Sequence, residues 1–452
     1  MARPPDTIAA LATPAGTSAL AVIRITGPDT ERIARALAGS PPPPRTARRF
    51  GYRDRDNVPV DDVVLTFFPE PRSATGEPVL EISCHGNPFI AQRILEDLFA
   101  RGCRPAEPGE FTKRAFLNGK MDLSQAEAVM ELISARSERA LAAALGQLRG
   151  SLGRHLNPLV EHLISALATV EAYIDFPEED LPRENRETLR RMIETVRNGA
   201  RQVLATHRHG DLLRDGIRTV IAGETNVGKS SLLNRLLGKD RAIVSPEPGT
   251  TRDFIEERAV IGPHGLRLID TAGLNPAPGA VERLGIEKTR ECIEEADIII
   301  LVVDAGRPSP PTDPRIAGRL TGGRTILALN KIDLFPEGAA PSAAFDGLTA
   351  VPVSALTGAG IAELKAEIIR RADSLQPEAG EDAVAINARH AHALATADDC
   401  LGQSLAKLAA NAQAELLASD LRGALDALGE ISGKIDNERV LDRLFAEFCI
   451  GK

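Results

Sequence analysis

The chain has 452 residues, 43% of them hydrophobic and 26% charged, with a formal net charge of −9. This length suggests about three globular domains, and the acidic balance excludes a generic nucleic-acid-binding protein, which would be basic overall. The cysteines form no Cys-x-x-Cys pair, which argues against a structural zinc site and a disulfide framework. The longest apolar run, residues 298–303, is too short to span a membrane, and we expect a cytoplasmic protein.

The first part of the chain, residues 1–118, predicts an α+β domain. Apolar, β-branched segments at residues 19–26 and 60–68 are flanked by proline or glycine, as strands commonly are. The proline-rich residues 40–46 predict a surface loop between them. Strand-like segments therefore alternate with turns up to the start of a long helical region.

Two stretches of the chain are predicted to be helical. In residues 119–215, helix-forming residues dominate and apolar positions recur at helical spacing, with Asp122 or Ser124 as a candidate N-cap. The helical pattern returns in residues 377–452, after an intervening region of a different kind. The two stretches form either one helical domain split by an insertion or two separate helical domains, and periodicity alone does not decide between these arrangements.

The intervening residues 216–376 alternate short β-branched strands with helix-length segments, which predicts a parallel sheet with crossover helices. Gly223–Ser230 reads GETNVGKS, a complete G-x-x-x-x-G-K-S, and it lies between a strand and a helix. Its glycines would let backbone N–H groups cradle phosphates, while Lys229 pairs with the β and γ oxygens. Ser230 can place its hydroxyl on Mg²⁺.

Three further motifs follow strands of the same region, in the order typical of a GTPase. The carboxylate of Asp270–Gly273, DTAG, can hold Mg²⁺ through water, and Thr251 is placed to complete the Mg²⁺ shell. In Asn330–Asp333, NKID, Asp333 can accept from N1–H and the 2-amino group of guanine, a donor pair that adenine lacks. Ser354–Leu356 suits a backbone contact to the base edge. Together these motifs predict GTP as the nucleotide.

The catalytic group for hydrolysis does not follow from these motifs. Leu274 comes after DTAG, at the position where Ras-type GTPases place the glutamine that orients the attacking water. Glu282, at the start of a predicted helix, is the nearest acidic candidate. Considered alone, Glu282 is better explained as a carboxylate that the helix dipole favours, so a catalytic role needs further support.

The motifs resemble, as a set, the bacterial tRNA-modification GTPase family MnmE, also called TrmE. The resemblance covers the whole chain and includes three more specific segments, namely VIRITG (22–27), VLEISCHGNPFI (79–90) and the terminal CIGK (449–452). It implies a multidomain fold, in which an N-terminal α+β domain dimerises and binds folate, and a Ras-like P-loop GTPase (G) domain is inserted into a split helical domain.

The same resemblance implies the reaction. With its FAD-containing partner MnmG (GidA), the family modifies C5 of the wobble uridine (U34) in tRNA. The product carries an aminomethyl or carboxymethylaminomethyl group. A tetrahydrofolate derivative, 5-formyl- or 5,10-methylene-tetrahydrofolate, supplies the one-carbon unit.

Carried over by position, the folate pocket would use Arg24, Glu81 and Lys120, and Lys452 would complete it. Arginine and lysine suit the glutamate carboxylates of a folate, and a carboxylate suits the donor edge of the pterin. The same tail would bring Cys449 near the reacting carbon, where a thiol beside lysines could act as a nucleophile or an acid.

The resemblance further implies that G domains dimerise across their nucleotide faces, with K⁺ in the place of an arginine finger. Asn226 matches the K⁺-ligating asparagine, and Ser245, Glu247 and Thr250 match the segment that gives further oxygens. Glu282 matches the family's catalytic glutamate, thought to orient water through another water. That role fits the absence of the Ras-type glutamine.

The expected nucleotide site combines the phosphate loop, two switch segments and the guanine-recognition motifs, with Ser230 and Thr251 as the Mg²⁺ ligands. Its residues are Asn226, Val227, Gly228, Lys229, Ser230, Ser231, Ser245, Pro246, Glu247, Pro248, Gly249, Thr250, Thr251, Asp270, Thr271, Ala272, Gly273, Asn330, Lys331, Asp333, Ser354 and Ala355.

Two other functions are compatible with the G motifs. A ribosome-assembly GTPase of the Era/Der type would carry a basic RNA-binding domain, which this acidic chain does not suggest. A regulatory switch would signal to partners without chemistry of its own. Binding of a folate would separate the tRNA-modification function from both.

Overall fold

The structure is a computed structural model. It describes residues 6–40, 43–175, 183–238, 255–270, 290–306, 318–335, 347–375, 384–433, 445–446, 448 and 450–451. The contacts divide the chain into two compact units. Unit 1 is Met1–Met130 with Gly429–Lys452, and unit 2 is Glu131–Leu428.

Unit 1 is built on a six-stranded sheet in the order β3-β4-β5-β2-β1-β6. Its neighbouring strands are antiparallel except β1 and β6. The strands are β1 (Ile8–Leu11), β2 (Leu20–Thr26), β3 (Arg48–Arg53), β4 (Pro59–Phe68), β5 (Val79–His85) and β6 (Arg104–Pro105). The strands expected at residues 19–26 and 60–68 are therefore confirmed as β2 and β4.

Helices cover both faces of this sheet. Ile33 of α1 (Thr30–Ala38) and Ile94 of α2 (Pro88–Ala100) pack with Ile23 of β2 in one buried core. On the other face, Phe111 of α3 (Glu110–Leu117) packs with Ile8 and other residues of a smaller core. This arrangement confirms the predicted α+β character.

The C-terminal tail belongs to the same unit. Phe445 and Phe448 pack on Leu123 of α4 (Leu123–Ser134) in a buried cluster, with their rings 5.1 Å apart. Further along, Ile450 forms a β-bridge with Pro108. The start of α4 is capped by Asp122, whose carboxylate accepts from the Gln125 N–H at 2.8 Å. Of the two predicted caps, Asp122 is the one used.

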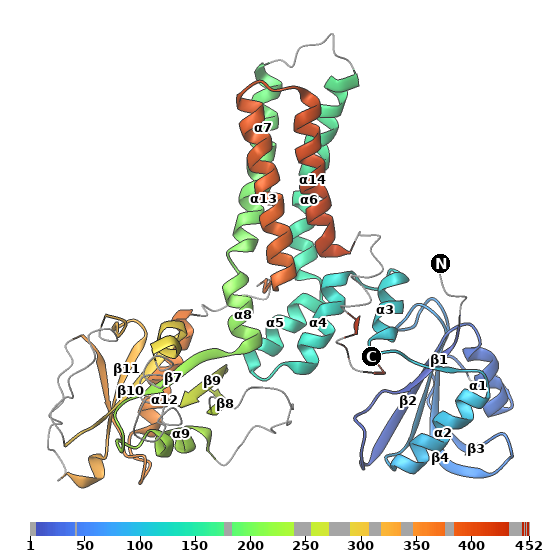
Figure 1. The fold of residues 1–452 in the computed structure, drawn as a ribbon. Helices are drawn as coiled ribbons and strands as arrows, with labels where there is room; N and C mark the ends of the chain where they lie inside the picture. Colours follow the sequence, from blue (N-terminus) through green and yellow to red (C-terminus); the bar gives the residue numbers. More distant parts are fainter. Residues whose placement is uncertain are drawn as a thin grey trace, which may run out of the picture. The chain divides into compact units, whose positions relative to one another are not determined.

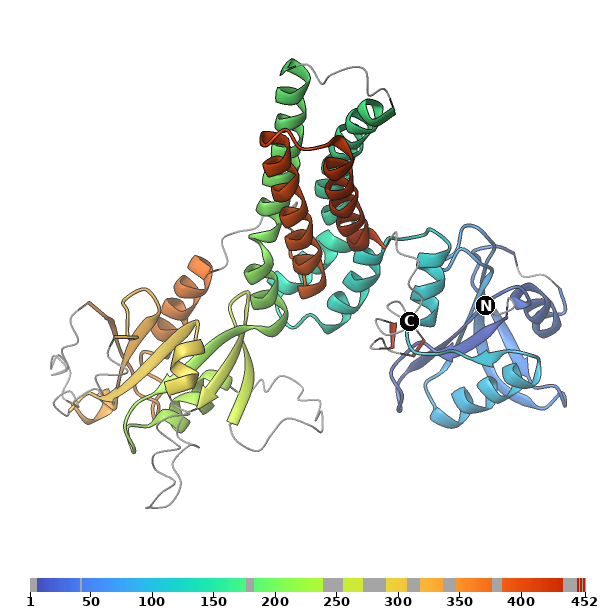
Figure 2. The same cartoon turned by 45° about the horizontal axis from the view of Figure 1, so that its top comes forward.

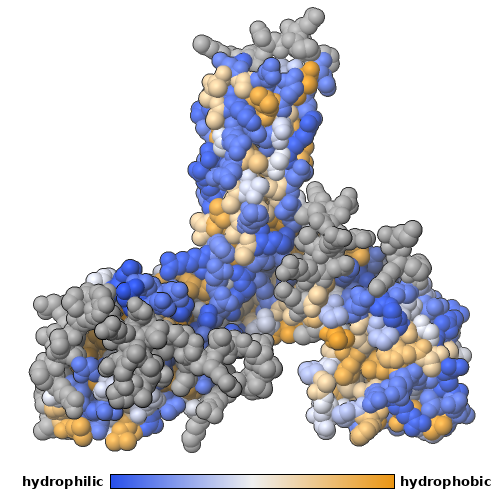
Figure 3. All heavy atoms as spheres, viewed as in Figure 1, coloured by the Kyte–Doolittle hydropathy of each residue, from blue (hydrophilic) through white to orange (hydrophobic). Residues whose placement is uncertain are grey.

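Unit 2 contains the helical part and the α/β part of the chain. The helices are α5 (Glu138–Leu148), α6 (Ser151–Asp175), α7 (Arg183–Leu204), α8 (His207–Asp215), α13 (Ala388–Ala409) and α14 (Ala414–Ser432). Figures 1 and 2 both show α6, α7, α13 and α14 side by side. The side of the bundle visible in Figure 3 is mostly hydrophilic, as expected for helices that bury their apolar faces against one another.

Contacts between distant segments show that the helical domain is split. Helix α7 packs against both α6 and α13. On the outside of the bundle, Arg422 of α14 donates to Glu171 of α6 at 2.8 Å. Because α13 and α14 follow the α/β part in sequence, the split arrangement is confirmed over two separate helical domains.

The α/β part has a six-stranded sheet in the order β12-β11-β10-β7-β9-β8, parallel except for the β8–β9 pair. The strands are β7 (Ile217–Ala222), β8 (Ile255–Ile261), β9 (His264–Asp270), β10 (Ile298–Asp304), β11 (Thr325–Asn330) and β12 (Thr349–Pro352). Its helices α9 (Lys229–Leu237) and α12 (Ile361–Leu375) pack with strands of the sheet in a shared core, and the short 3₁₀ helix η2 (Ile332–Leu334) follows β11. The predicted parallel sheet with crossover connections is confirmed.

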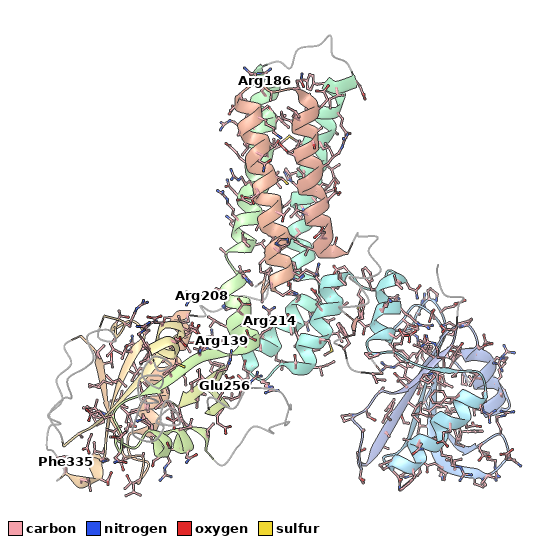
Figure 4. The ribbon with its side chains drawn as sticks, viewed as in Figure 1. Arg139, Arg186, Arg208, Arg214, Glu256 and Phe335 are labelled. Carbon is pink, nitrogen blue, oxygen red and sulfur yellow. The ribbon has the colours of Figure 1, made fainter. Side chains whose placement is uncertain are left out.

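Arginines project from the end of the helical part that adjoins this sheet (Figure 4). Arg139 of α5 pairs with Asp373 of α12 at 2.6 Å. His264, at the start of β9, also lies 3.0 Å from Asp373. Arg208 of α8 pairs with Asp297 at 3.3 Å. The insertion is therefore tied to the helices by ion pairs. Among the helices described, none is long and apolar enough to cross a membrane.

Candidate functional site

The phosphate loop connects β7 to α9, as the sequence predicts. Two of its glycines are required by geometry, since Gly223 has φ +149° and Gly228 has φ +98°. A Cβ at Gly223 would lie 2.3 Å from the Val302 carbonyl oxygen, and one at Gly228 would lie 2.3 Å from the Asn330 amide nitrogen. The loop can therefore pass close to β10 and to the Asn330 side chain at the end of β11 only because side chains are absent there.

Lys229 begins α9 and is 6% exposed. Its ammonium group donates to the backbone carbonyls of Gly223 at 2.9 Å and Glu224 at 2.6 Å. Burial lowers the pKa of Lys229, and the negative charges of Asp270 and Glu224 act against this effect. The lysine is thus held inside the loop that would cradle phosphates, at the N-terminal end of a helix.

Ser230 and Asp270, two of the three residues expected at Mg²⁺, lie together, and the third, Thr251, is outside the described residues. The Ser230 hydroxyl donates to the Asp270 carboxylate at 2.8 Å, and Asp270 is 1% exposed at the end of β9. Mg²⁺ in nucleotide sites takes one or two protein oxygens and completes its shell with phosphate and water. This pair fits such an ion. In the described part of the chain no cluster of three or more His, Cys, Asp or Glu could hold a metal by itself.

Asn330 connects the phosphate loop to the guanine motifs. Its side-chain amide donates to the Val227 carbonyl at 2.7 Å and accepts from the Ala355 N–H at 2.9 Å. The side chain is buried, with the residue 2% exposed. Because both of its polar ends are satisfied, Asn330 holds these two loops at a defined separation.

Lys331 and Asp333 follow Asn330 and make contacts of their own. Lys331 pairs with Asp304, at the end of β10, at 2.9 Å. Asp333 accepts a hydrogen bond from the Ser354 hydroxyl. Asp304 was missed by the sequence reasoning. Its position at the end of a parallel strand, beside the strand that carries NKID, is the signal that could have found it.

A pocket of about 650 Å³ is formed where these segments meet, a size suitable for a small ligand. Its polar and backbone lining includes Gly228, Ser231, Asn330, Lys331, Asp333 and Ala355. Six of the residues predicted to bind GTP are thus brought together although their positions in sequence span 128 residues.

Several predicted residues fall outside the described part of the chain. They are the K⁺ and switch segment Ser245–Thr251, Thr271–Gly273, Glu282, Cys449 and Lys452.

Two of the described folate candidates, Arg24 and Glu81, lie on the neighbouring strands β2 and β5. Arg24 and Glu81 face each other across β2 and β5, and the guanidinium donates to the carboxylate at 2.7 Å and 3.0 Å. The guanidinium carbon also lies 5.9 Å from the centroid of the Phe111 ring. Lys120 donates instead to the Pro71 carbonyl at 3.0 Å. Arg24 and Glu81 are therefore directly paired, whereas Lys120 is anchored to a loop.

The C-terminal tail contacts β1, the strand that pairs with β2. A Cβ at Gly451 would lie 2.3 Å from the Leu11 carbonyl oxygen. In the β1–β2 register, Leu11 faces Ile23, and the neighbouring Ala10 faces Arg24. The structure thus places the tail near the strand that carries Arg24.

The other cysteines offer no reactive alternative to Cys449. Cys84, Cys103 and Cys292 are buried, and Cys400 is partly buried. Burial raises the pKa of each of these thiols, to about 12 for Cys103. A thiol with a raised pKa is rarely in the nucleophilic thiolate form.

Comparisons with known proteins agree with this architecture. The model of the TrmE N-terminus, described as a GTP-binding protein, matches residues 7–120, and that of the MnmE helical domain matches residues 123–449. The chain belongs to the MnmE family. A tRNA modification GTPase MnmE from Opitutus terrae is 59% identical over 447 residues, which cover 99% of each chain. The MnmE of Akkermansia muciniphila is 45% identical and covers both chains completely.

Solved structures of GTPases are also similar to part of this MnmE-family chain. Aquifex aeolicus Era bound to GDP and aluminium fluoride is 29% identical with a TM-score of 0.27, covering 40% of this chain and 65% of its own. The G domain of the Thermotoga maritima FeoB iron transporter is 25% identical with a TM-score of 0.25, covering 34% and 98%. The fold of this part is defined by the sheet and helices described above.

Proposed function

We propose that this chain hydrolyses GTP to GDP and phosphate as part of tRNA modification. The observation that carries the proposal is the position of Asn330, whose side chain bonds to Val227 in the phosphate loop and to Ala355. Ala355 belongs to the loop after β12 that is predicted to contact the guanine base, here called the base loop. The full-length similarity to proteins named tRNA modification GTPase MnmE supports the biological setting.

In the proposed nucleotide site, different residues bind the phosphates, the Mg²⁺ ion, the guanine base and the attacking water. Lys229 and the loop N–H groups bind the phosphates, and Ser230 and Thr251 would hold Mg²⁺, which would supply charge neutralisation at the transferred group. Asp333 accepts from the paired donors of guanine, so that adenine nucleotides leave this acceptor unsatisfied. Glu282 orients the attacking water.

The activity is proposed to depend on K⁺ in a dimer of G domains. The ligands would be Asn226, Ser245, Glu247 and Thr250. Asn226 is supported by its place in the phosphate loop, with the left-handed backbone angle φ +64° that brings the loop round the phosphates. A cation at this place would stabilise negative charge in the transition state, as an arginine finger does.

The modification itself is proposed to involve a homodimer, the FAD-dependent partner MnmG (GidA) and tRNA. The tetrahydrofolate derivative would be bound by Arg24, Glu81, Lys120 and Lys452. Cys449 would act near the one-carbon unit that the folate supplies to C5 of U34. The support is the Arg24–Glu81 pair across β2 and β5 and the contact of the tail with β1, the strand next to β2. The proposed domains are residues 1–118, 119–215, 216–376 and 377–452.

The deciding experiment is GTP turnover in KCl and in NaCl at matched ionic strength. We expect K⁺ to stimulate turnover at least about tenfold, because it supplies transition-state charge stabilisation. Asn226→Ala should lose the stimulation while it keeps GDP binding. Equal rates in both salts would contradict the K⁺ mechanism, and failure of the wild-type chain to hydrolyse GTP would contradict the proposed function.

Folate binding is tested separately by calorimetry with 5-formyl-tetrahydrofolate. Arg24→Ala should abolish the heat of binding, because the anionic ligand loses a charge-assisted donor. The matched control is Arg49→Ala, which removes another arginine–carboxylate pair of the same sheet, with Asp62 at 2.6 Å. Equal loss in both variants would show a general disturbance of the domain instead of a folate site at Arg24.

A further inference from the structure

Arg235 occupies an unusual place on α9, the helix that begins at the phosphate loop. It lies nearly two turns beyond Lys229, and its side chain crosses to the loop after β12. The guanidinium Nε donates to the Ala355 carbonyl at 3.1 Å, and Nη2 donates to the Leu356 carbonyl. One arginine thus holds two consecutive carbonyls of the segment predicted to contact the base.

Two backbone N–H groups of this loop and the Ser354 hydroxyl are held by further hydrogen bonds. The Ala355 N–H donates to Asn330 at 2.9 Å, and the Thr357 N–H donates to the Ser354 hydroxyl at 3.1 Å. That hydroxyl in turn donates to Asp333, the residue expected to read guanine. The loop is therefore held on one side by Asn330 and Asp333 and on the other by Arg235.

This arrangement connects the two ends of the nucleotide pocket through one rigid element. The first residue of α9, Lys229, lies at the phosphate end, and Arg235 of the same helix fixes the loop at the base end. Both Arg235 and the loop residue Ala355 line the pocket. The distance between the phosphate site and the base loop is thus set by a helix and a planar two-donor fork.

We infer that Arg235 is a positioning residue that sets the affinity for the guanine base, an inference that rests on the proposed GTP site. Arg235 acts through the Ala355 and Leu356 carbonyls and not on the phosphates. Its loss lets the base loop move away from Asp333, so that the base contacts weaken and the phosphate contacts do not. Because Arg235 is itself exposed, its replacement removes little buried surface.

The experiment compares Arg235→Ala and Arg235→Lys with the full-length wild-type chain. Binding of GDP and of inorganic pyrophosphate is measured by competition with a fluorescent guanine nucleotide. For Arg235→Ala we expect the GDP dissociation constant to rise about tenfold, as for the loss of charge-assisted hydrogen bonds, and pyrophosphate binding to stay unchanged. Arg235→Lys should restore part of the affinity, since lysine offers a point donor without the fork.

Steady-state turnover gives an independent readout. The KM for GTP should rise in Arg235→Ala, while kcat at saturating GTP stays unchanged, because the reacting phosphate is not touched. The control is Arg370→Ala on α12, an exposed arginine that pairs with Glu367 of its own helix and does not line the pocket. This control should bind GDP as the wild type does.

Each outcome separates the inference from the proposed function. Unchanged GDP affinity in Arg235→Ala, with normal binding by the wild type, would overturn the inference alone. Equal weakening of GDP and pyrophosphate would also overturn it, because it would show a general loss of structure. Wild-type chain that binds no guanine nucleotide would overturn the proposed function together with the inference.

Discussion

At the scale of single residues, the site depends on side chains that are fixed by specific partners. Asn330 bonds to Val227 and Ala355, and Lys331 is held by Asp304. Because the polar groups of such side chains are paired, a replacement leaves a partner unsatisfied. Asp333 differs, since it keeps acceptor capacity toward the pocket besides its bond from Ser354.

Replacing Asp333 with asparagine should reverse the preference for the base. An asparagine amide at this position would offer one acceptor and one donor group, and it could not accept from both N1–H and the 2-amino group of guanine. We expect D333N to lose at least about a hundredfold in GDP affinity and to gain affinity for xanthosine diphosphate, which carries an oxygen at position 2. Binding of both nucleotides by fluorescence competition checks this, and unchanged GDP affinity would remove Asp333 from the base site.

At the scale of elements, capping decides where helices begin. Helix α13 starts with a capping box in which the Asn387 side chain accepts from the His390 N–H at 2.9 Å. In return the Asn387 N–H donates to the His390 ring at 3.4 Å. A histidine takes the place that glutamate or glutamine usually holds in this box. This helix receives the chain as it returns from the α/β part.

Asn387→Ala should therefore destabilise the helical domain by about 1 kcal/mol, the usual cost of losing an N-cap. Chemical denaturation followed by circular dichroism measures this change. Asn198, which is exposed inside α7, provides the control. Asn198→Ala should leave the stability unchanged or raise it slightly, because alanine favours helix interiors. Equal loss in the two variants would contradict the role of the cap.

A charged cluster beside the sheet of unit 1 predicts a pH dependence. Burial by itself raises the pKa of Glu110, but hydrogen bonds from Arg104, the Glu107 N–H and Arg114 outweigh burial and hold the pKa below its ordinary value of 4.5. Its contribution to stability is thus fully present above that value and is lost as the pH falls through the lower folded pKa.

We expect Glu110→Gln to flatten the loss of stability below about pH 4.5. The midpoint of urea unfolding, measured from pH 6 downwards in steps, reports this effect. Glu31, whose ion pair with Arg35 is largely exposed, gives the matched control. A slope in Glu110→Gln that equals those of the wild type and Glu31→Gln would show that Glu110 does not titrate with unfolding.

At the scale of the whole molecule, the α/β part is an insertion whose entry and return lie close together. Helix α8 carries the chain toward β7, and a Cβ at its Gly210 would lie 2.4 Å from the Ile386 carbonyl oxygen. Ile386 is fully buried just before α13. The chain therefore leaves the helical domain after α8 and re-enters it before α13 at neighbouring positions, so that the helical domain is continuous without the insertion.

Replacing residues 217–383 with a short glycine-serine linker should leave the helical domain folded. Because α7 packs directly on both α6 and α13, the surface buried between these helices does not require the inserted sheet. We expect a helical circular dichroism spectrum with a cooperative melt and no binding of GDP. A non-cooperative melt would contradict the independence of the helical domain.

The sequence by itself determined those features whose residues are neighbours along the chain. The phosphate loop, DTAG, NKID and the strand and helix periods are local patterns, so the GTPase site and the α+β and α/β parts could be predicted from them. Asp122 could be named as a cap for the same reason.

Only the tertiary structure decided the features that depend on partners far apart in sequence. Periodicity identifies the apolar face of α7 but does not identify α13 as the helix that covers it, so only the contact between α7 and α13 decides for one split helical domain. The same holds for Asp304 beside Lys331 and for Arg235 on the Ala355 carbonyl. Pairing across a fold depends on where packing brings backbones together, because hydrogen bonds act over about 3 Å regardless of the separation along the chain.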